Sequence, residues 1–345
     1  MKRSFFIRGG VFAVTIAMVL SGCSQAAPTK SPEEMLKDGM SKLRTVTSHE
    51  FEIALNADIT GPKGETPAKV KFNAVLGGAL DVKNPKDPKI NLKLDGSGDS
   101  DGAPGSAGFE LRLDKDNMYF DLAKLDIKDG KAGKSLVPPE LVGYVGKWFS
   151  LPIPPGSLDE LTAALPNGGG SQETLTPAQQ KMKDLFEKTQ FFKNIKFVGV
   201  DDVKGEQSFH YTADVDTAAL ETVIMTVAAD NGQPMTAEQK QKMHESMAKF
   251  NFVGNVWVGK DSGVLNQVSG DIKLPVSDSD PSGTISVRVT LWNLNKPVTV
   301  TVPKDATEFP LKGMMGGLMG GAAGAGADVT AGIDGADLNL DATVP

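Results

Sequence analysis

The residue types that most often carry chemistry are scarce in this chain. Cys23 is the single cysteine among 345 residues, and the three histidines are His49, His210 and His244. The histidines lie far apart in the sequence, and none has a metal-ligand spacing to another histidine or to the cysteine. We therefore expect each histidine to be a solvated or hydrogen-bonded surface residue.

The stretch "DGSGDSDG" at 95–102 is rich in aspartate and raises the question of a calcium loop. An EF-hand loop that begins at Asp95 needs Gly at its sixth position and Glu at its twelfth. This chain has Ser100 and Ser106 at those positions, so the template fails. A solvated hairpin loop explains the glycines and aspartates better.

Soft-metal binding and catalysis likewise have no supporting motif. Met314, Met315 and Met319 could offer thioethers to Cu(I), but they stand in a Gly-rich stretch without a nearby His or Cys. No G-x-S-x-G, phosphate-binding loop or dinucleotide fingerprint occurs, and no Ser-His-Asp set has recognisable surroundings. The scattered carboxylates are compatible with the catalytic pair of a glycosidase, but no motif identifies two of them as such a pair. We therefore predict that the protein is not an enzyme and has no cofactor and no metal.

The residues that precede Cys23 indicate why the chain has this single cysteine. Lys2, Arg3 and Arg8 form a basic start, and residues 9–20 form an apolar run shorter than the ~20 residues that a membrane helix needs. This order is typical of a secretory signal. The sequence Leu20-Ser21-Gly22-Cys23 resembles the lipobox of bacterial lipoprotein signal peptides, which implies diacylglycerol attachment to Cys23 and cleavage before it. The alternative is an uncleaved anchor helix with an incidental buried cysteine.

Residues 1–22 are thus predicted to be a signal peptide, and residues 23–30 a tether that holds an extracytoplasmic body to the cell membrane or envelope. A signal with three positive charges leaves the mature chain near −7 − 3 = −10. An acidic body argues against nucleic acid as a partner and against adsorption to anionic lipid through overall charge. Because no second cysteine exists, stability must come from a core rather than from disulfides.

The body is predicted to begin with a helix at residues 31–43. Ser31 can cap this helix, Pro32 suits its first turn, and Glu34 completes a capping box. Three apolar residues recur at helical spacing: Leu36, Met40 and Leu43. This spacing indicates that the helix packs on an apolar surface.

Beyond the helix the hydrophobic period changes to two, which is typical of strands with one apolar face. In "HEFEIALNADIT" at 49–60, apolar residues alternate with polar ones. Four similar runs follow around residues 70–76, 90–94, 109–113 and 118–122, separated by loops rich in Gly, Pro, Asp and Ser. Five consecutive strands predict an antiparallel meander.

Residues 126–190 are predicted to be a helical insertion into the meander. The proline-rich stretch at 135–156 is expected to wrap the surface rather than to join a sheet. Capped helices are expected at 157–165 and 176–188.

The sheet is predicted to resume after the insertion. A hairpin at 194–216 is followed by helices at 217–229 and 236–250, by strands at 251–260, 264–276 and 284–292, and by a short edge strand at 297–303. After residue 310 the chain is rich in Gly and Ala, so residues 311–345 are predicted to be a disordered tail. The main domain would therefore span residues 31–310.

This order of elements carries a family resemblance. The stretches "SHEFEIALNADI", "NMYFDL", "VGVDDVKGEQSFHYTADVD" and "NKPVTVTVP" together resemble the LolA/LolB-like superfamily, and most of all the LppX/LprG-type lipoproteins of actinobacteria, over residues 31–305. The resemblance implies an α+β fold, in which a strongly curved antiparallel half-barrel has helices covering its concave face. It also implies a hydrophobic cavity that carries lipid or a lipidated small molecule, and an envelope transport protein as a partner.

We therefore predict a membrane-anchored lipoprotein that binds or carries acyl chains. A C16 chain such as palmitate would gain about 12 kcal/mol gross on leaving water for a dry cavity. The alternative is a structural or adaptor lipoprotein with a filled core that binds a protein partner, and a weaker third reading is an anchored hydrolase. The residues predicted to line the cavity are the inward ones: Phe51, Ile53, Leu55, Phe72, Leu92, Phe109, Leu111, Phe120, Leu220, Ile224, Val287 and Val289.

Overall fold

The computed structural model describes residues 28–62, 69–84, 86–129, 133–154, 180–181, 184–185, 188–230, 233–249, 251–274 and 281–309. The predicted signal peptide, Cys23 and the predicted tail lie outside the described residues. So do the helix predicted at 157–165 and most of the one at 176–188. The chain divides into a unit of Met1–Ala306 and a unit of Thr307–Pro345. In the second unit the structure describes Thr307–Phe309, which include the short strand β12 (Thr307–Glu308).

The first described helix, α2 (Pro32–Leu43), begins at the predicted capping box. Ser31 Oγ accepts a hydrogen bond from the Glu34 N–H at 3.2 Å, and Glu34 Oε2 accepts one from the Ser31 N–H at 3.2 Å. Two backbone donors that a helix start leaves unpaired are thus satisfied. The other described helices are α3 (Pro139–Val142), α6 (Thr217–Asp230) and α7 (Ala237–Lys249).

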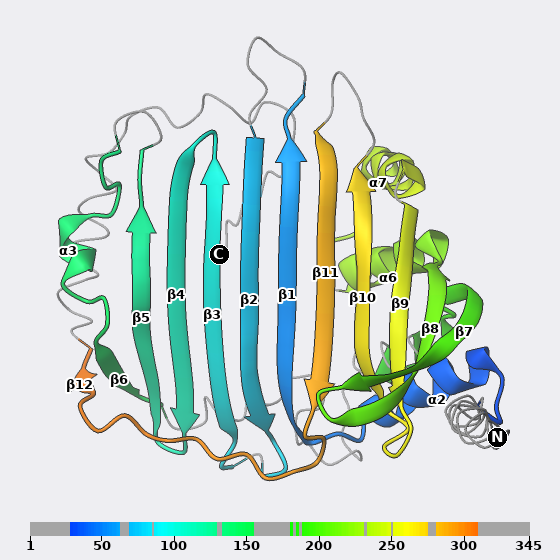
Figure 1. The fold of residues 1–345 in the computed structure, drawn as a ribbon, viewed down its shortest axis with the longest axis horizontal. Helices are drawn as coiled ribbons and strands as arrows, with labels where there is room; N and C mark the ends of the chain where they lie inside the picture. Colours follow the sequence, from blue (N-terminus) through cyan, green and yellow to red (C-terminus); the bar gives the residue numbers. More distant parts are fainter. Residues whose placement is uncertain are drawn as a thin grey trace, which may run out of the picture. The chain divides into compact units, whose positions relative to one another are not determined.

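The strands of the first unit form one open antiparallel sheet (Figure 1). Their bounds are β1 (Ser48–Thr60), β2 (Lys69–Asp81), β3 (Lys89–Ser100), β4 (Ala103–Asp114), β5 (Asn117–Ile127), β6 (Trp148–Pro152), β7 (Phe192–Val203), β8 (Glu206–Val215), β9 (Asn251–Gly259), β10 (Leu265–Leu274) and β11 (Ser282–Trp292). Neighbours follow the order β6-β5-β4-β3-β2-β1-β11-β10-β9-β8-β7. The predicted meander is confirmed, and so is the α+β class with a sheet that does not close, as in a half-barrel.

Residues 95–106, of which 95–102 were predicted to form a solvated hairpin loop, are instead mostly sheet. β3 continues to Ser100 and β4 starts at Ala103, so only Asp101 and Gly102 turn the chain. Both have positive φ, 53° and 81°, which is the Asp-Gly chemistry of a two-residue hairpin turn. Backbone pairing between the strands overrides the low β-propensity of the glycines and serines, which suggested a loop.

Two proline-flanked stretches also differ from the prediction. Residues 148–152, predicted to wrap the surface, form β6 and pair with β5, because the only proline of this run is its last residue. Residues 297–303, predicted to be an edge strand, are irregular. Pro297 and Pro303 cannot donate to a ladder. Instead, the Thr301 carbonyl accepts a hydrogen bond from Arg112 Nη1 at 2.7 Å.

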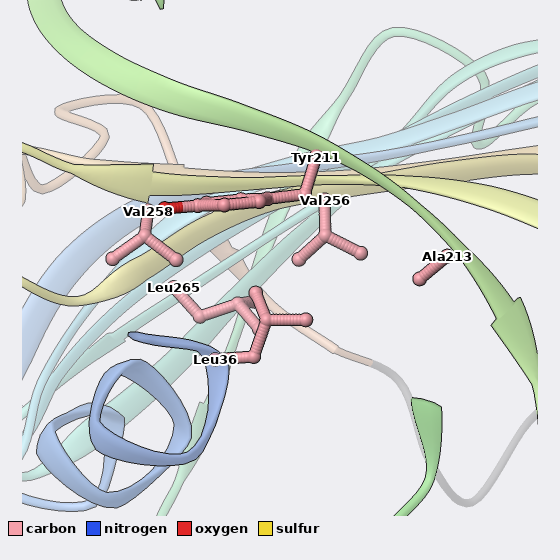
Figure 2. Close-up of a cluster of buried hydrophobic side chains, with 6 residues drawn as sticks. All are labelled: Leu36, Tyr211, Ala213, Val256, Val258 and Leu265. Atoms are coloured by element: carbon pink, nitrogen blue, oxygen red, sulfur yellow. The ribbon is translucent and has the colours of Figure 1, made fainter. Parts of the chain in front are cut away.

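The main described core lies where α2 packs on β7, β9 and β10. Figure 2 shows Leu36 of α2 pointing toward side chains of β8, β9 and β10. The fully or nearly buried members of this cluster are Leu36, Tyr211, Ala213, Val256, Val258 and Leu265. Gly39 permits the close approach, since a Cβ there would lie 3.1 Å from the Leu265 nitrogen. The predicted apolar side of this helix is therefore confirmed.

Candidate functional site

One face of the sheet is apolar across its central strands, and the register shows how its side chains align. On β1, Phe51, Ile53 and Leu55 alternate with Glu52, Ala54 and Asn56, which lie on the opposite side. Ile53 lies opposite Val289 of β11 on one side and Leu76 of β2 on the other. Residues paired across strands share a face, so these side chains form one row.

The rows continue to the far strands. Leu76 lies opposite Leu94 of β3, which lies opposite Phe109 of β4. In the next row, Leu92 of β3, Leu111 of β4 and Phe120 of β5 follow one another, and Phe120 lies opposite Phe149 of β6. The rings of Phe120 and Phe149 have centroids 5.6 Å apart. We call this side of β11, β1, β2, β3, β4 and β5 the apolar face.

Charge is excluded from the apolar face. The alternation and the register place every Asp, Glu, Lys and Arg of β1–β4 and β11 on the opposite side of the sheet. Among them are Glu52 of β1, Lys93 of β3 and Arg288 of β11. A side chain or ligand on the apolar face therefore meets no charge on these strands, and the polar side chains there are Ser100, at the end of β3, and one histidine.

That histidine is His49, at the start of β1. It lies opposite Leu80, and its ring centroid is 6.0 Å from that of Phe51. Its Nδ1 has no hydrogen-bond partner among the described residues, and burial lowers the pKa of its imidazole. The prediction of a solvated or hydrogen-bonded surface residue is therefore wrong for His49, because strand alternation turns it toward the apolar side.

The other two histidines are hydrogen-bonded, as predicted. His210 Nε2 lies 2.9 Å from Asn255 Oδ1, and its ring stacks on Trp257 with centroids 4.4 Å apart. His244 Nδ1 lies 3.1 Å from Glu221 Oε2 and so joins α7 to α6. Within the described residues, no three His, Cys, Asp or Glu side chains are grouped as a metal site would need.

Ten of the twelve residues predicted to line a cavity come together on the apolar face: Phe51, Ile53, Leu55, Phe72, Leu92, Phe109, Leu111, Phe120, Val287 and Val289. The other two, Leu220 and Ile224, lie on α6, which packs against α7. The lipid attachment predicted at Cys23 lies outside the described residues.

Sequence reasoning left out several members of the same face. Leu76, Leu94, Ile285 and Leu291 obey the alternation of the chosen residues and could have been included by that signal alone. Ile127 could not, because the register between β4 and β5 shifts between Gly108 and Glu110. A bulge of this kind resets which residues of a strand share a face.

None of the twelve predicted residues is buried. Ile53 and Phe72 expose 36% and 40% of their surface, and the other eight predicted residues on the face are half-buried. Ile90 and Leu113, in the row of His49, are buried. Helix α2 covers another part of this side of the sheet, where Tyr211, Val256 and Val258 are fully buried. The apolar face therefore continues a covered core into a region where large side chains keep contact with solvent.

Two hollows are lined by described residues. One, of about 360 Å³, lies at the ends of β1, β2, β3 and β11 and is bordered by polar side chains, among them Asn56, Asn73 and Asp99, together with Phe72. The other, of about 550 Å³, is lined by Thr226 of α6 and by Gln180, Lys181, Asp184, Leu185 and Lys188. Of the predicted lining residues only Phe72 borders either hollow, so the open apolar face is the stronger candidate for a binding surface.

No helix in the described ranges combines the length and the hydropathy of a bilayer-spanning segment. No protein-family model matches the chain, and no curated protein matches it either.

Three solved structures are similar to this chain. LprF from Mycobacterium bovis has 11% identity and a TM-score of 0.32, covering 81% of this chain and 99% of that one. LppX from Mycobacterium tuberculosis has 18% identity and a TM-score of 0.27, covering 78% and 98%. A putative outer membrane lipoprotein-sorting protein domain from Vibrio parahaemolyticus has 8% identity and a TM-score of 0.15, covering 79% and 95%.

Proposed function

We propose that this protein is an extracytoplasmic lipoprotein that binds the acyl chains of a lipid on its apolar face. The observation that carries the proposal is the set of ten large and uncharged side chains that the register places side by side and that the described chain leaves half-exposed. Exposed apolar surface of this extent is unfavourable in water, at ~25 cal/mol per Å², unless a ligand covers it.

An acyl chain suits this surface better than a protein partner does. Protein interfaces intersperse apolar contacts with about one hydrogen bond per 100–200 Å². The apolar face offers two polar side chains, His49 and Ser100, which lie on different strands, and no charge on β1–β4 or β11. Such a surface can cover a hydrocarbon chain fully, while the polar head of the lipid stays in water.

The energetics allow reversible exchange. A chain of about sixteen carbons gains about 12 kcal/mol gross when it leaves water, but it loses a similar apolar environment when it leaves a bilayer. Transfer between bilayer and protein is therefore near neutral. A carrier of this kind needs proximity to a membrane more than it needs very tight binding.

That proximity is the role we assign to Cys23. In the mature chain a diacylglycerol on Cys23 and a tether of residues 23–30 would keep the body within reach of the membrane surface. Two acyl chains hold stably where one gives only marginal binding. Mass spectrometry of the membrane-extracted protein should show the N-terminal peptide beginning at a lipid-modified Cys23, and Cys23→Ser should abolish both the modification and the membrane retention.

The binding test uses the full chain extracted from its native membrane. Native mass spectrometry should find a stoichiometric, non-covalent lipid that organic solvent removes, and titration of the emptied protein with a fluorescent C16 fatty acid should restore binding. Ile53→Asp, which places a charge on the apolar face, should reduce this affinity at least tenfold. Asn56→Asp is the matched control, because it adds the same charge to the opposite side of β1 and should leave the affinity unchanged.

The alternatives give different results. A protein that is always empty and that ignores the fatty acid rules the proposal out. If that empty protein retains one envelope protein through the same face, and Ile53→Asp releases it, the adaptor function replaces lipid binding.

A further inference from the structure

The most exposed large apolar side chains of the described residues are not on the apolar face but beside it. Leu136 exposes 61% of its surface and Val142 exposes 58%. Both belong to residues 133–147, which we call the edge segment and which includes α3 beside β5 (Figure 1). Two such side chains in one short segment need an explanation, because single exposed apolar residues are common but grouped ones mark contact surfaces.

The edge segment is held in place while these two side chains point away from the core. The Leu136 N–H donates to the Ile127 carbonyl of β5 at 2.8 Å, and the Gly146 N–H donates to the Leu122 carbonyl at 2.9 Å. Val137, next to Leu136, is buried. The exposure of Leu136 is therefore a property of a fixed backbone, not of a loose loop.

The charge around the edge segment is opposite in sign to that of the chain. The edge segment contains two lysines and one acidic residue, Glu140, whereas the whole chain has a net charge of −7. Lys134 and Lys147 lie within the edge segment and are exposed. Lysines beside exposed apolar side chains are typical of segments that rest in the interface of an anionic bilayer.

The edge segment also adjoins the open end of the apolar face. Ile127, which accepts the hydrogen bond from Leu136, exposes 42% of its surface. It lies opposite Gly105 of β4, which lies opposite Gly98 of β3, which in turn lies opposite Phe72 of β2. A hydrocarbon chain that leaves a membrane at Leu136 could reach Phe72 without crossing a charged strand residue of this row.

We infer that the edge segment docks on the surface of a bilayer that contains anionic lipid, with Leu136 and Val142 inserted among the headgroups and Lys134 and Lys147 beside them. The docking deepens the proposed function, because it rests on acyl binding by the apolar face and gives the cargo a route to it. A neutral apolar patch would suit any apolar partner, but the local lysines in an acidic protein favour an anionic surface.

The test places a thiol-reactive, polarity-sensitive fluorophore on Leu136→Cys or Val142→Cys in the full chain reconstituted into vesicles. Once Cys23 carries its lipid, the introduced cysteine is the only free thiol, because the natural chain has no other. The fluorophore at either position should shift to shorter wavelength with vesicles of phosphatidylcholine and phosphatidylglycerol, and should shift much less with phosphatidylcholine alone. Lys37→Cys, an exposed site on α2, is the control and should show no shift.

Charge reversal then tests the lysines. Lys134→Glu together with Lys147→Glu should remove most of the shift on anionic vesicles, while the fluorescent fatty acid binds the same protein in vesicle-free solution with unchanged affinity. Fluorophores at residues 136 and 142 that behave like the one at residue 37 overturn the docking, even if the fatty acid binds. Loss of fatty-acid binding with the vesicle shift intact overturns the proposed cargo instead. Equal shifts on neutral and anionic vesicles overturn the role of the lysines.

Discussion

Tyr211 of β8 and Val256 of β9 lie directly opposite each other, and neither exposes any surface to solvent. The Tyr211 hydroxyl is buried without a hydrogen-bond partner among the described residues, and burial raises its pKa to about 12. A buried hydroxyl without a partner costs about 1–3 kcal/mol of desolvation. The centre of the main core thus contains a polar atom that lowers the stability of the fold.

Tyr211→Phe should therefore stabilise the protein by about 1 kcal/mol, because the ring remains and the unpaired hydroxyl is removed. Chemical denaturation at pH 7 measures this. The pH dependence of stability in the alkaline range tests the same residue. Because the folded pKa is raised, the natural chain should lose stability as pH rises from about 10 through about 12, while the phenylalanine variant should lose less. A destabilised variant would show that the hydroxyl has a partner after all.

Gly39 should not tolerate a large side chain, although glycine is a poor helix former. A Cβ at this position would lie 3.1 Å from the Leu265 nitrogen and 3.4 Å from Val258 Cγ1. Gly39→Leu should destabilise the protein by about 2 kcal/mol, since overpacking outweighs the gain in helix propensity of about 1 kcal/mol. Urea titration measures both variants. Lys37→Ala, at an exposed position of the same helix, should change stability by less than about 0.5 kcal/mol. Similar effects of the two substitutions would contradict the close packing of α2.

His49 should make stability fall in mild acid. Burial lowers the pKa of its imidazole in the folded protein, so the unfolded chain binds the proton more readily. The stability that depends on neutral His49 is complete above the unfolded pKa of about 6.5 and is lost as pH falls through the lower folded value. His49→Phe should reduce the difference between urea midpoints at pH 7.5 and pH 5.5. An unchanged difference would assign the acid sensitivity to other groups.

Arg112 should be important for the half of the sheet that contains β4 and β5. Its guanidinium donates to Glu110 Oε1 at 2.6 Å from Nη2 and at 3.0 Å from Nε, and to the Thr301 carbonyl at 2.7 Å. It also stacks over the Trp148 ring at 4.4 Å. Arg112→Ala should cost about 2 kcal/mol, because these three hydrogen bonds and the stacking are lost in a half-buried setting. Arg112→Lys keeps the charge but not the planar fork, so it should recover only part of the loss in thermal unfolding. Full recovery by lysine would mean that charge alone matters.

Local pattern was sufficient for the elements whose hydrophobic period is strong. Alternation in "HEFEIALNADIT" predicted β1 and the side to which Phe51, Ile53 and Leu55 belong, and the Ser31–Glu34 pair predicted the start of α2. Because each strand shows only one apolar side, the ten residues of the apolar face could be chosen strand by strand. Their adjacency follows from the register and not from any single stretch.

The wrong predictions arise where strand pairing, rather than local sequence, decides the structure. Residues 95–106 have the composition of a loop but pair as two neighbouring strands, and residues 148–152, a short run between prolines, pair with the edge of β5. The orientation of His49 was predicted wrongly, because this polar residue was assigned to the surface by its chemistry rather than by its position in the alternating strand. The surface position of most of the edge segment was predicted from its prolines, but the exposure of Leu136 was not, since it depends on a hydrogen bond to Ile127.

The place of β1 between β2 and β11 has a consequence for how the chain folds. Glu50 accepts a hydrogen bond from the Trp292 indole, 242 residues away, so the middle of the sheet forms only when both ends of the domain are present. Contacts this distant in sequence slow folding, because the loop must close before the pairing stabilises it. Until Ser282–Trp292 arrives, β1 presents a long unpaired edge with one apolar side, and the nascent domain depends on protection from aggregation at that edge.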